Sequence, residues 1–240
     1  MQNFSSKDSA ETRFWDERFE TAFTPWDKGG VPQALQDFVR AAEAPLVTLI
    51  PGCGNGYEAA FFAQANWDVT AIDFSPVAVR SAQAAIGVWS KHVIEADFFQ
   101  FNPARPLQLI YERAFFCALP PRLRKDIVQR WAGLLAEGGL LAGYFFFEDV
   151  PNITSATSAT SATSATSATS VTSAAKAATP SASQDTKPKG PPFSIQRQAW
   201  QELILPYFSL VEDCDVSDSI DVFKGKERWQ IWRRLPVSVT

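Results

Sequence analysis

Short apolar runs alternate along the chain with segments of helical periodicity, and this alternation predicts an α/β fold with a buried sheet. The predicted strands are residues 46–50, 69–72, 92–94, 107–111, 140–147, 208–213 and 228–233. Helices are predicted at 57–65, 76–85, 122–135 and 198–205, most clearly at 122–135, where apolar residues recur on one face. In the last strand Trp229 and Ile231 face one way while Gln230 and Trp232 face the other. We expect that strand to lie inside the sheet because it is apolar on both faces.

The most informative stretch, Leu46 to Asp73, is typical of a strand, a glycine turn, a helix, a second strand and an acid. This is the βαβ plan of nucleotide binding, in which an acid about 20 residues after the first glycine accepts hydrogen bonds from a ribose. Gly52, Gly54 and Gly56 make the turn GxGxG. Dinucleotide sites instead use GxGxxG, because a pyrophosphate sits on the helix N-terminus. The alternative is a glycine-rich turn that merely connects a strand to a helix.

Charge and cysteine usage exclude several classes of function. The net charge is -4, with 22 Lys and Arg against 26 Asp and Glu, so no global basic field favours nucleic acid or an anionic membrane. The three cysteines form no CxxC pair, which argues against a disulfide framework or zinc site and favours a reducing compartment. A single histidine, His92, cannot build a histidine-rich metal site. With neither a signal-peptide pattern nor a bilayer-length apolar run, we expect a soluble cytoplasmic protein that binds no metal, nucleic acid or membrane.

Residues 151–189 differ from the rest of the chain in composition. The tripeptide TSA recurs in tandem from Thr154 to Ala174, with one unit reading TSV, and Ala, Thr, Ser, Lys and Pro dominate as far as Lys189. A segment without aromatic side chains or a large apolar content cannot offset its ordering entropy, so we expect a disordered insertion. The polar residues 1–12 are expected to form a flexible N-terminus, which leaves residues 13–240 as a single domain.

Large aromatic residues crowd the stretch between residues 13 and 30; they are Phe14, Trp15, Phe19, Phe23 and Trp26. Trp15, Phe19 and Phe23 are four apart and would share one helical face, which could simply dock on the core. Trp26 lies between a proline and two glycines, so we expect it outside the helix. Residues 13–45 could instead close over a ligand as an aromatic lid, since aromatic faces attract a sulfonium cation.

Several short motifs resemble, in order, those of the thiopurine S-methyltransferase family, which includes plant thiol and halide methyltransferases. The motifs are residues 14–19 (FWDERF), 24–29 (TPWDKG), 50–54 (IPGCG) with 56–58 (GYE), 71–75 (AIDFS), 114–119 (AFFCAL), 190–193 (GPPF) and 224–227 (KGKE). They span the chain from residue 13 to residue 234 apart from the insertion. The resemblance implies a class I methyltransferase fold, which is a three-layer Rossmann-like α/β fold with a seven-stranded, mainly parallel sheet and helices on both faces. It also implies S-adenosylmethionine (SAM) as methyl donor and a small-molecule methyl acceptor as partner. We expect a monomer.

The same resemblance implies roles for individual residues. Asp73 would bind the ribose, Asp97 the adenine amino group, and Phe98 would pack on the adenine ring. Arg113 would lie near the cofactor and the acceptor, where a guanidinium could pair a carboxylate. The implied cofactor-binding residues are Trp15, Trp26, Gly52, Gly54, Gly56, Asp73, Asp97, Phe98 and Arg113. The implied acceptor-positioning residues are Trp26, Arg113, Phe115 and Phe193, with Phe116 as a further wall residue. Asp97 could instead belong to an ordinary acidic loop, and Arg113 could pair only with Glu112 or Asp16.

Methyl transfer from a sulfonium to an anion neutralises charge in an in-line displacement, so positioning and desolvation can carry catalysis without a general base. A thiol, thiopurine, halide or selenium or tellurium species suits such a site because its reactive form is polarisable and anionic. Asp16 or Asp27 could assist deprotonation, although the chemistry does not require it. The alternatives are a non-catalytic SAM-binding regulator, a methyltransferase for another small molecule or for a macromolecule, and a nicotinamide oxidoreductase. An amino-directed enzyme would be expected to carry Asn/Asp-Pro-Pro-aromatic after the fourth strand, where this chain has Glu112 to Phe115.

Overall fold

The computed structural model describes residues 4–148 and 190–236. The helices are α1 (Thr12–Glu20), α2 (Gln33–Ala41), α3 (Tyr57–Gln64), α4 (Pro76–Ile86), α5 (Phe115–Ala118), α6 (Arg124–Leu134) and α7 (Arg197–Ile204). The strands are β1 (Val47–Pro51), β2 (Asp68–Asp73), β3 (Val93–Glu95), β4 (Leu107–Arg113), β5 (Leu135–Phe146), β6 (Phe208–Asp215) and β7 (Glu227–Arg234). Short 3-10 helices, Gly87–His92 and Pro121–Leu123, precede β3 and α6. The alternation of strands and helices confirms the predicted α/β class.

The strands form one sheet in the order β3-β2-β1-β4-β5-β7-β6. The first five strands of that order pair in parallel, while β7 pairs antiparallel with both β5 and β6. The order reverses between β1 and β4, and ligands of open α/β sheets bind in the crevice at such a switch point. β7 lies between β5 and β6, which confirms the prediction of an internal strand.

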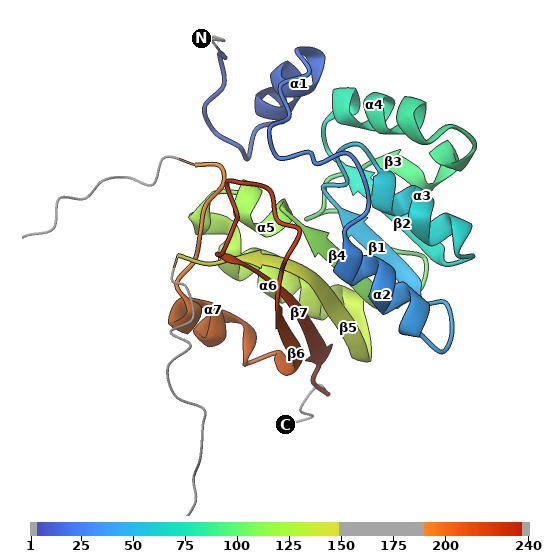
Figure 1. The fold of residues 1–240 in the computed structure, drawn as a ribbon, viewed down its shortest axis with the longest axis vertical. Helices are drawn as coiled ribbons and strands as arrows, with labels where there is room; N and C mark the ends of the chain where they lie inside the picture. Colours follow the sequence, from blue (N-terminus) through green and yellow to red (C-terminus); the bar gives the residue numbers. More distant parts are fainter. Residues whose placement is uncertain (1–3, 149–189, 237–240) are drawn as a thin grey trace, which may run out of the picture. The chain divides into compact units, whose positions relative to one another are not determined.

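Each face of the sheet is covered by its own hydrophobic core, and Figure 1 shows helices on both sides of the strands. On one face β4, β5 and β7 pack against α5, α6 and α7, with Trp131 and Trp200 fully buried. On the other face β1, β2 and β4 pack against α2, α3 and α4, with Phe62 and Leu35 fully buried. The two cores hold the sheet rigid and leave the carboxyl ends of its strands free for a site.

Gln230 is a polar residue in β7, which lies inside the sheet between β5 and β6. Its side chain is buried, and its Oε1 accepts hydrogen bonds of 3.0 Å from the indole N–H groups of both Trp200 and Trp232. Burying two tryptophans normally leaves two donors to satisfy, and one amide oxygen satisfies both. The predicted division of faces in β7 is confirmed, because Trp229 and Ile231 join one core and Trp232 the other.

Three local features differ from the expectations. The amphipathic helix α2 was not predicted; its residues belong to the segment 13–45, which was predicted to form a lid. β5 begins at Leu135 rather than 140, because Leu135 already pairs with Leu107 of β4. α1 ends at Glu20, so Phe23 does not share a helical face with Trp15 and its side chain is largely exposed.

Residues 4–11 contact α1, which itself begins at Thr12, although the polar sequence of residues 1–12 predicts a flexible end. The backbone N–H of Ser5 donates to a Glu17 carboxylate oxygen at 2.8 Å, and the indole of Trp15 donates to the carbonyl of Ser9 at 2.8 Å. Phe4 packs its ring against Phe23, with centroids 5.5 Å apart. The predicted disordered insertion, residues 151–189, lies outside the described residues.

Candidate functional site

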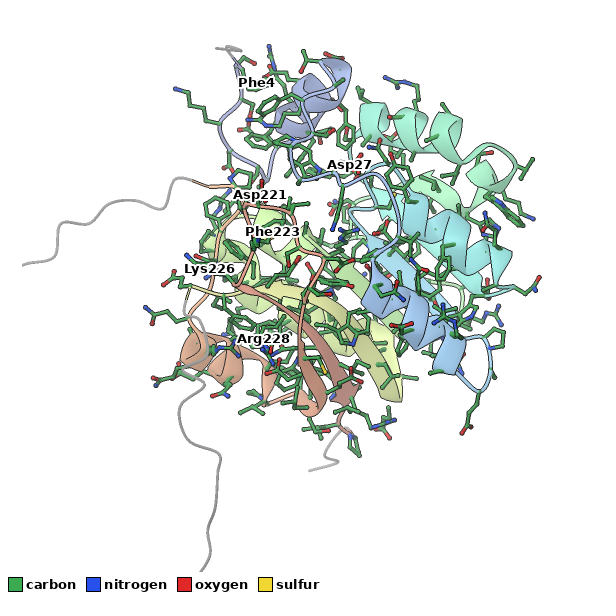
Figure 2. All side chains as sticks on the ribbon, viewed as in Figure 1. Phe4, Asp27, Asp221, Phe223, Lys226 and Arg228 are labelled. Atoms are coloured by element: carbon green, nitrogen blue, oxygen red, sulfur yellow. The ribbon has the colours of Figure 1, made fainter. Side chains whose placement is uncertain are left out.

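A cavity of about 370 Å³ opens at the carboxyl ends of β1, β2 and β4, at the switch point of the sheet. Its floor comes from the turn after β1 and from the ends of β2 and β4, and its roof from α1 and the loop that follows. Residues from α5, from 190–192 and from the loop between β6 and β7 close the remaining side. Phe4 beside α1, Asp27 in the roof loop and Phe223 in the β6–β7 loop are labelled in Figure 2. A volume of this size suits a small organic ligand.

The glycine turn brings bare backbone to the cavity. Gly52 has φ +60°, and a Cβ placed there would lie 2.7 Å from Cδ2 of Phe115, so a side chain would be strained and would require the Phe115 ring to move. Gly56 has φ +73° and forms the N-cap of α3, where L residues are strained. Gly52 and Gly54 line the cavity, whereas Gly56 faces α4, since a Cβ there would meet Ala82 at 3.2 Å.

Asp73 ends β2 and its side chain lies in the cavity wall. One carboxylate oxygen accepts from the N–H of Ser75 at 3.0 Å, and the other accepts from the N–H of Gly54 at 3.3 Å. The carboxylate therefore links the turn after β1 to the turn after β2. Burial raises the pKa of Asp73 to about 6, while its backbone hydrogen bonds oppose that shift.

Arg113, at the end of β4, forms an ion pair with Glu58 in the first turn of α3. Nη1 of Arg113 lies 3.1 Å from Oε1 of Glu58, and it also donates to the carbonyl of Gly30 at 3.3 Å. The partner is neither Glu112 nor Asp16, the two acids considered from the sequence. Burial raises the pKa of Glu58, and the neighbouring guanidinium opposes that shift. Because the pair is largely screened from solvent, the Glu58 carboxylate offsets much of the positive charge of Arg113.

The roof of the cavity is aromatic. Trp15 of α1 and Trp26 of the following loop meet edge to face with centroids 5.4 Å apart, and Phe19 contacts Trp26 at 6.2 Å. Asp27 fastens this roof to the floor, because its carboxylate accepts from Asn55 Nδ2 and from the Tyr57 hydroxyl, the latter at 3.4 Å. Its other oxygen accepts from the N–H of Gly29 at 2.7 Å. Asp27 thus anchors the loop through both of its carboxylate oxygens.

Most residues implied by the resemblance line this one cavity; they are Trp15, Trp26, Gly52, Gly54, Asp73, Phe98, Arg113 and Phe115. Gly56, Asp97, Phe116 and Phe193 are not among the lining residues. The Asp97 carboxylate instead accepts from the N–H of Phe99 and from Gln100 Nε2, both at 2.9 Å. Phe193 packs over Gly190, where a Cβ would lie 2.2 Å from its ring.

Some lining residues were not expected from the sequence. Glu58, Tyr111 and Arg18 bring polar groups to the cavity, and Phe223 brings a ring from the loop between β6 and β7. Glu58 lies 55 residues before Arg113 in sequence, so only the packing of α3 against β4 brings the pair together. Glu58 is the acid of the motif GYE. Its position at the start of a helix, beside the glycine turn, was the sequence signal that could have identified it as a site residue.

Metal, thiol and membrane features are limited in the described part of the chain. Within residues 4–148 and 190–236, no group of three or more His, Cys, Asp or Glu side chains is arranged to hold a metal ion. Cys53, Cys117 and Cys214 are free thiols, and burial raises the pKa of both Cys53 and Cys117. Over the same ranges, every helix is too short or too polar to cross a bilayer.

The fold and the site define a class I methyltransferase, and comparisons with known proteins agree. The solved 1,6-didemethyltoxoflavin-N1-methyltransferase of Burkholderia thailandensis superposes with a TM-score of 0.62 at 14% identity, covering 94% of this chain and 87% of that chain. A profile of the thiopurine S-methyltransferase family matches residues 10–147. The chain belongs to the thiopurine S-methyltransferase family, and it is a SAM-dependent methyltransferase.

Two plant relatives extend the similarity over nearly the whole chain. The probable thiol methyltransferase 2 of Arabidopsis thaliana is 24% identical over 226 residues, which is 92% of this chain and 84% of the relative. Thiocyanate methyltransferase 1 of Brassica oleracea is 24% identical over 234 residues, covering 95% of this chain and 88% of the relative. The similarity therefore includes the C-terminal strands that follow the insertion.

Proposed function

We propose that this enzyme transfers the SAM methyl group to the sulfur of a small thiol, or to another small soft anion, by in-line displacement. The observation that carries the proposal is the cavity at the strand ends, which joins a bare glycine turn to an aromatic roof. The names of the plant relatives, a thiol and a thiocyanate methyltransferase, support an acceptor of this kind.

In this proposal the donor occupies the part of the cavity nearest β1 and β2. The ribose would bind Asp73, Phe98 would pack on the adenine, and the backbone of Gly52 and Gly54 would contact the amino-acid portion. The Glu58–Arg113 pair lies beside the turn, where it would orient a charged group of the donor or the acceptor. Asp97, whose two oxygens each accept one hydrogen bond within its own loop, would contribute to adenine binding through a remaining lone pair.

The sulfonium would face the aromatic roof of Trp15 and Trp26, since aromatic faces stabilise cations that have lost their water. The acceptor would enter between that roof and the wall formed by Phe115 and residues 190–192, with Phe193 supporting that wall from behind. Such a site removes water from an anionic nucleophile and aligns it with the methyl group, which is the chemistry that methyl transfer needs. Asp27 anchors the roof loop through both of its oxygens, so the proposal assigns it a structural role and takes the thiolate as the reactive form of the acceptor.

A second function, a SAM-binding regulator without catalysis, predicts tight binding without turnover. The decisive experiment incubates the full chain with methyl-labelled SAM and a panel of thiols, halides, selenide and thiopurines, followed by mass spectrometry of the products. Labelled methyl on sulfur, selenium or halide supports the proposal. Tight SAM binding with no labelled product from any member would favour the regulator instead.

We also propose that the enzyme works as a monomer in the cytosol, with residues 13–45 as its lid and 151–189 as a dispensable insertion. One chain supplies every residue of the described cavity, so a second copy is not needed to complete it. Three free cysteines suit a reducing compartment. Light scattering of the purified protein at micromolar concentration tests the oligomeric state.

A further inference from the structure

Arg18 is a cation that the proposed transfer does not use. It lies on α1 and lines the cavity together with Trp15 and Phe19 of the same helix. Residues three and four apart on a helix share a face, which explains why Arg18 follows Trp15 into the cavity wall. Its side chain is only partly exposed, so its charge is held close to the ligand space.

The guanidinium of Arg18 is fixed by two rings and one carbonyl. Its Cζ lies 3.2 Å from the ring centroid of Phe14 and 4.3 Å from that of Phe4. Its Nη1 donates to the carbonyl of Phe14 at 2.6 Å. A guanidinium that contacts two rings and donates to a carbonyl has restricted motion, which lowers the entropy lost when an anion binds to its remaining N–H groups.

No carboxylate pairs with Arg18 among residues 4–148 and 190–236. The arginines that do form ion pairs there are Arg13, Arg40, Arg105, Arg113, Arg122, Arg197 and Arg228. The neighbouring Glu17 attracts Arg18 at longer range, but its oxygens accept from Ser5 and Arg13. Burial lowers the pKa of Arg18, yet an arginine stays protonated at physiological pH.

The acids that line the cavity are already engaged elsewhere. Asp73 accepts from Ser75 and Gly54, Asp27 from Gly29 and Tyr57, and Glu58 pairs with Arg113. Lys28 also lines the cavity, but it lies on an exposed loop and its ammonium donates to the carbonyl of Asp218. Arg18 is therefore a partly buried positive charge whose remaining donors lack an acidic partner in the described structure.

The position of Arg18 on α1 separates it from the nucleoside part of the site. Asp16, two residues earlier, contacts Ser75 beside the predicted ribose acid. Residues two apart on an α-helix point about 200° from one another, so Arg18 faces away from that contact. It faces Phe14 and Phe4 instead, and Phe4 in turn packs on Phe23 at the exposed rim.

We propose that Arg18 binds a carboxylate on the methyl acceptor, which makes small thiols that carry an acid group the preferred substrates. This inference rests on the proposed function and adds a specificity-determining residue to it. A guanidinium and a carboxylate can form two parallel hydrogen bonds, and the Nε and Nη2 groups of Arg18, which do not donate to any residue of the described structure, are suited to this geometry.

The test compares 3-mercaptopropionate with neutral 3-mercaptopropan-1-ol in full-length wild type, Arg18→Gln and Arg13→Gln. Arg13 is a matched control, since it is an exposed arginine on the same helix that does not line the cavity. We expect Arg18→Gln to lower kcat/KM for the acid at least ~10-fold and for the alcohol by less than ~3-fold, as the loss of a two-point, charge-assisted contact to the carboxylate predicts. Arg13→Gln should change both by less than ~2-fold, because an exposed i,i+4 ion pair contributes little.

Calorimetry separates the acceptor from the donor and from a failure of catalysis. SAM affinity should stay within ~3-fold in Arg18→Gln, whereas binding of 3-mercaptopropionate to the complex with S-adenosylhomocysteine should be lost. Equal losses for both thiols, or a loss confined to SAM affinity, overturn the proposal. If wild type methylates neither these thiols nor any other member of the acceptor panel, the proposed function fails, and the calorimetric measurement still decides for or against Arg18.

Discussion

The carboxylate of Asp16 on α1 accepts a 2.6 Å hydrogen bond from the hydroxyl of Ser75, the residue that caps α4. The same hydroxyl accepts from the N–H of Ala78, so one oxygen serves both the helix cap and the roof helix. Ser75 lies two residues after Asp73, and its backbone N–H donates to the Asp73 carboxylate. The position of the roof is thus coupled to the residue predicted to bind ribose.

Replacing either partner separates the two functions of this contact. Ser75→Ala should lower the free energy of unfolding by about 1–2 kcal/mol, because it removes a helix cap at a fully buried position. Asp16→Ala keeps the cap, so its unfolding free energy should change by less than ~0.5 kcal/mol while SAM affinity falls by ~3-fold or more. Urea unfolding and calorimetry measure the two quantities, and unchanged SAM affinity in both variants would show that the contact does not position the roof.

Asp73 should make SAM binding depend on pH. A ribose hydroxyl donates best to an ionised carboxylate, and burial raises the pKa of Asp73 to about 6. SAM affinity should therefore rise between pH 5 and 7 by up to ~10-fold and then level off, since about one carboxylate in ten is ionised one unit below its pKa. Asp73→Asn should bind SAM at least ~10-fold more weakly at pH 7.5 and lose this pH dependence, as measured by calorimetry. A variant with the affinity of the wild type would remove Asp73 from the ribose site.

Glu112 should destabilise the folded enzyme at alkaline pH. Its carboxyl group is buried, one oxygen accepts from Phe116 N–H at 2.7 Å, the other has no partner in the described structure, and burial raises its pKa to about 8. The folded state keeps a proton that the unfolded state releases above its ordinary pKa of about 4.3, so stability falls as pH rises from ~5 to ~8 by up to ~1.4 kcal/mol per unit.

Glu112→Gln keeps the acceptor for Phe116 and cannot ionise, so it should match the wild type near pH 5 and exceed its stability at pH 8. Urea unfolding of both proteins at the two pH values gives the difference. If the difference in unfolding free energy between the two proteins does not change with pH, Glu112 does not hold a proton in the folded state.

Residues 154–189 should be removable. The chain segments on either side of the insertion are joined, because Glu148 N–H donates to the carbonyl of Ile195 at 3.0 Å and Ile195 N–H donates to that of Phe146 at 3.2 Å. A short Gly/Ser linker in place of 154–189 should leave the melting temperature within ~3 °C and the methyl-transfer rate within ~2-fold. Calorimetric melting and product formation test this, and loss of folding on deletion would give the insertion a structural role.

Much of the fold follows from the sequence because strands buried on both faces are mostly apolar, as at residues 46–50 and 107–111, where Thr48 and Gln108 are the polar exceptions. The glycine turn was likewise predictable, since its positive φ angles favour glycine. Asp73 was predictable from its position at the end of the second strand, about 20 residues after the first glycine. Side-chain partners were not predictable, because the Glu58–Arg113 pair and the Asp16–Ser75 contact join residues 55 and 59 apart in sequence. The lack of an acidic partner for Arg18 in the described structure also depends on packing. Helical spacing alone does not predict that the Glu17 carboxylate accepts from the N–H of Ser5.

The most direct test of the account compares a thiol with an amine of the same shape. Initial rates of S-adenosylhomocysteine formation are measured for 3-mercaptopropionate and β-alanine at equal concentration with saturating SAM. We expect the thiol to react at least ~100-fold faster, because desolvation in an apolar site favours a polarisable anion over an ammonium that must first lose a proton. Equal or faster transfer to the amine would contradict the assignment of a soft-nucleophile methyltransferase.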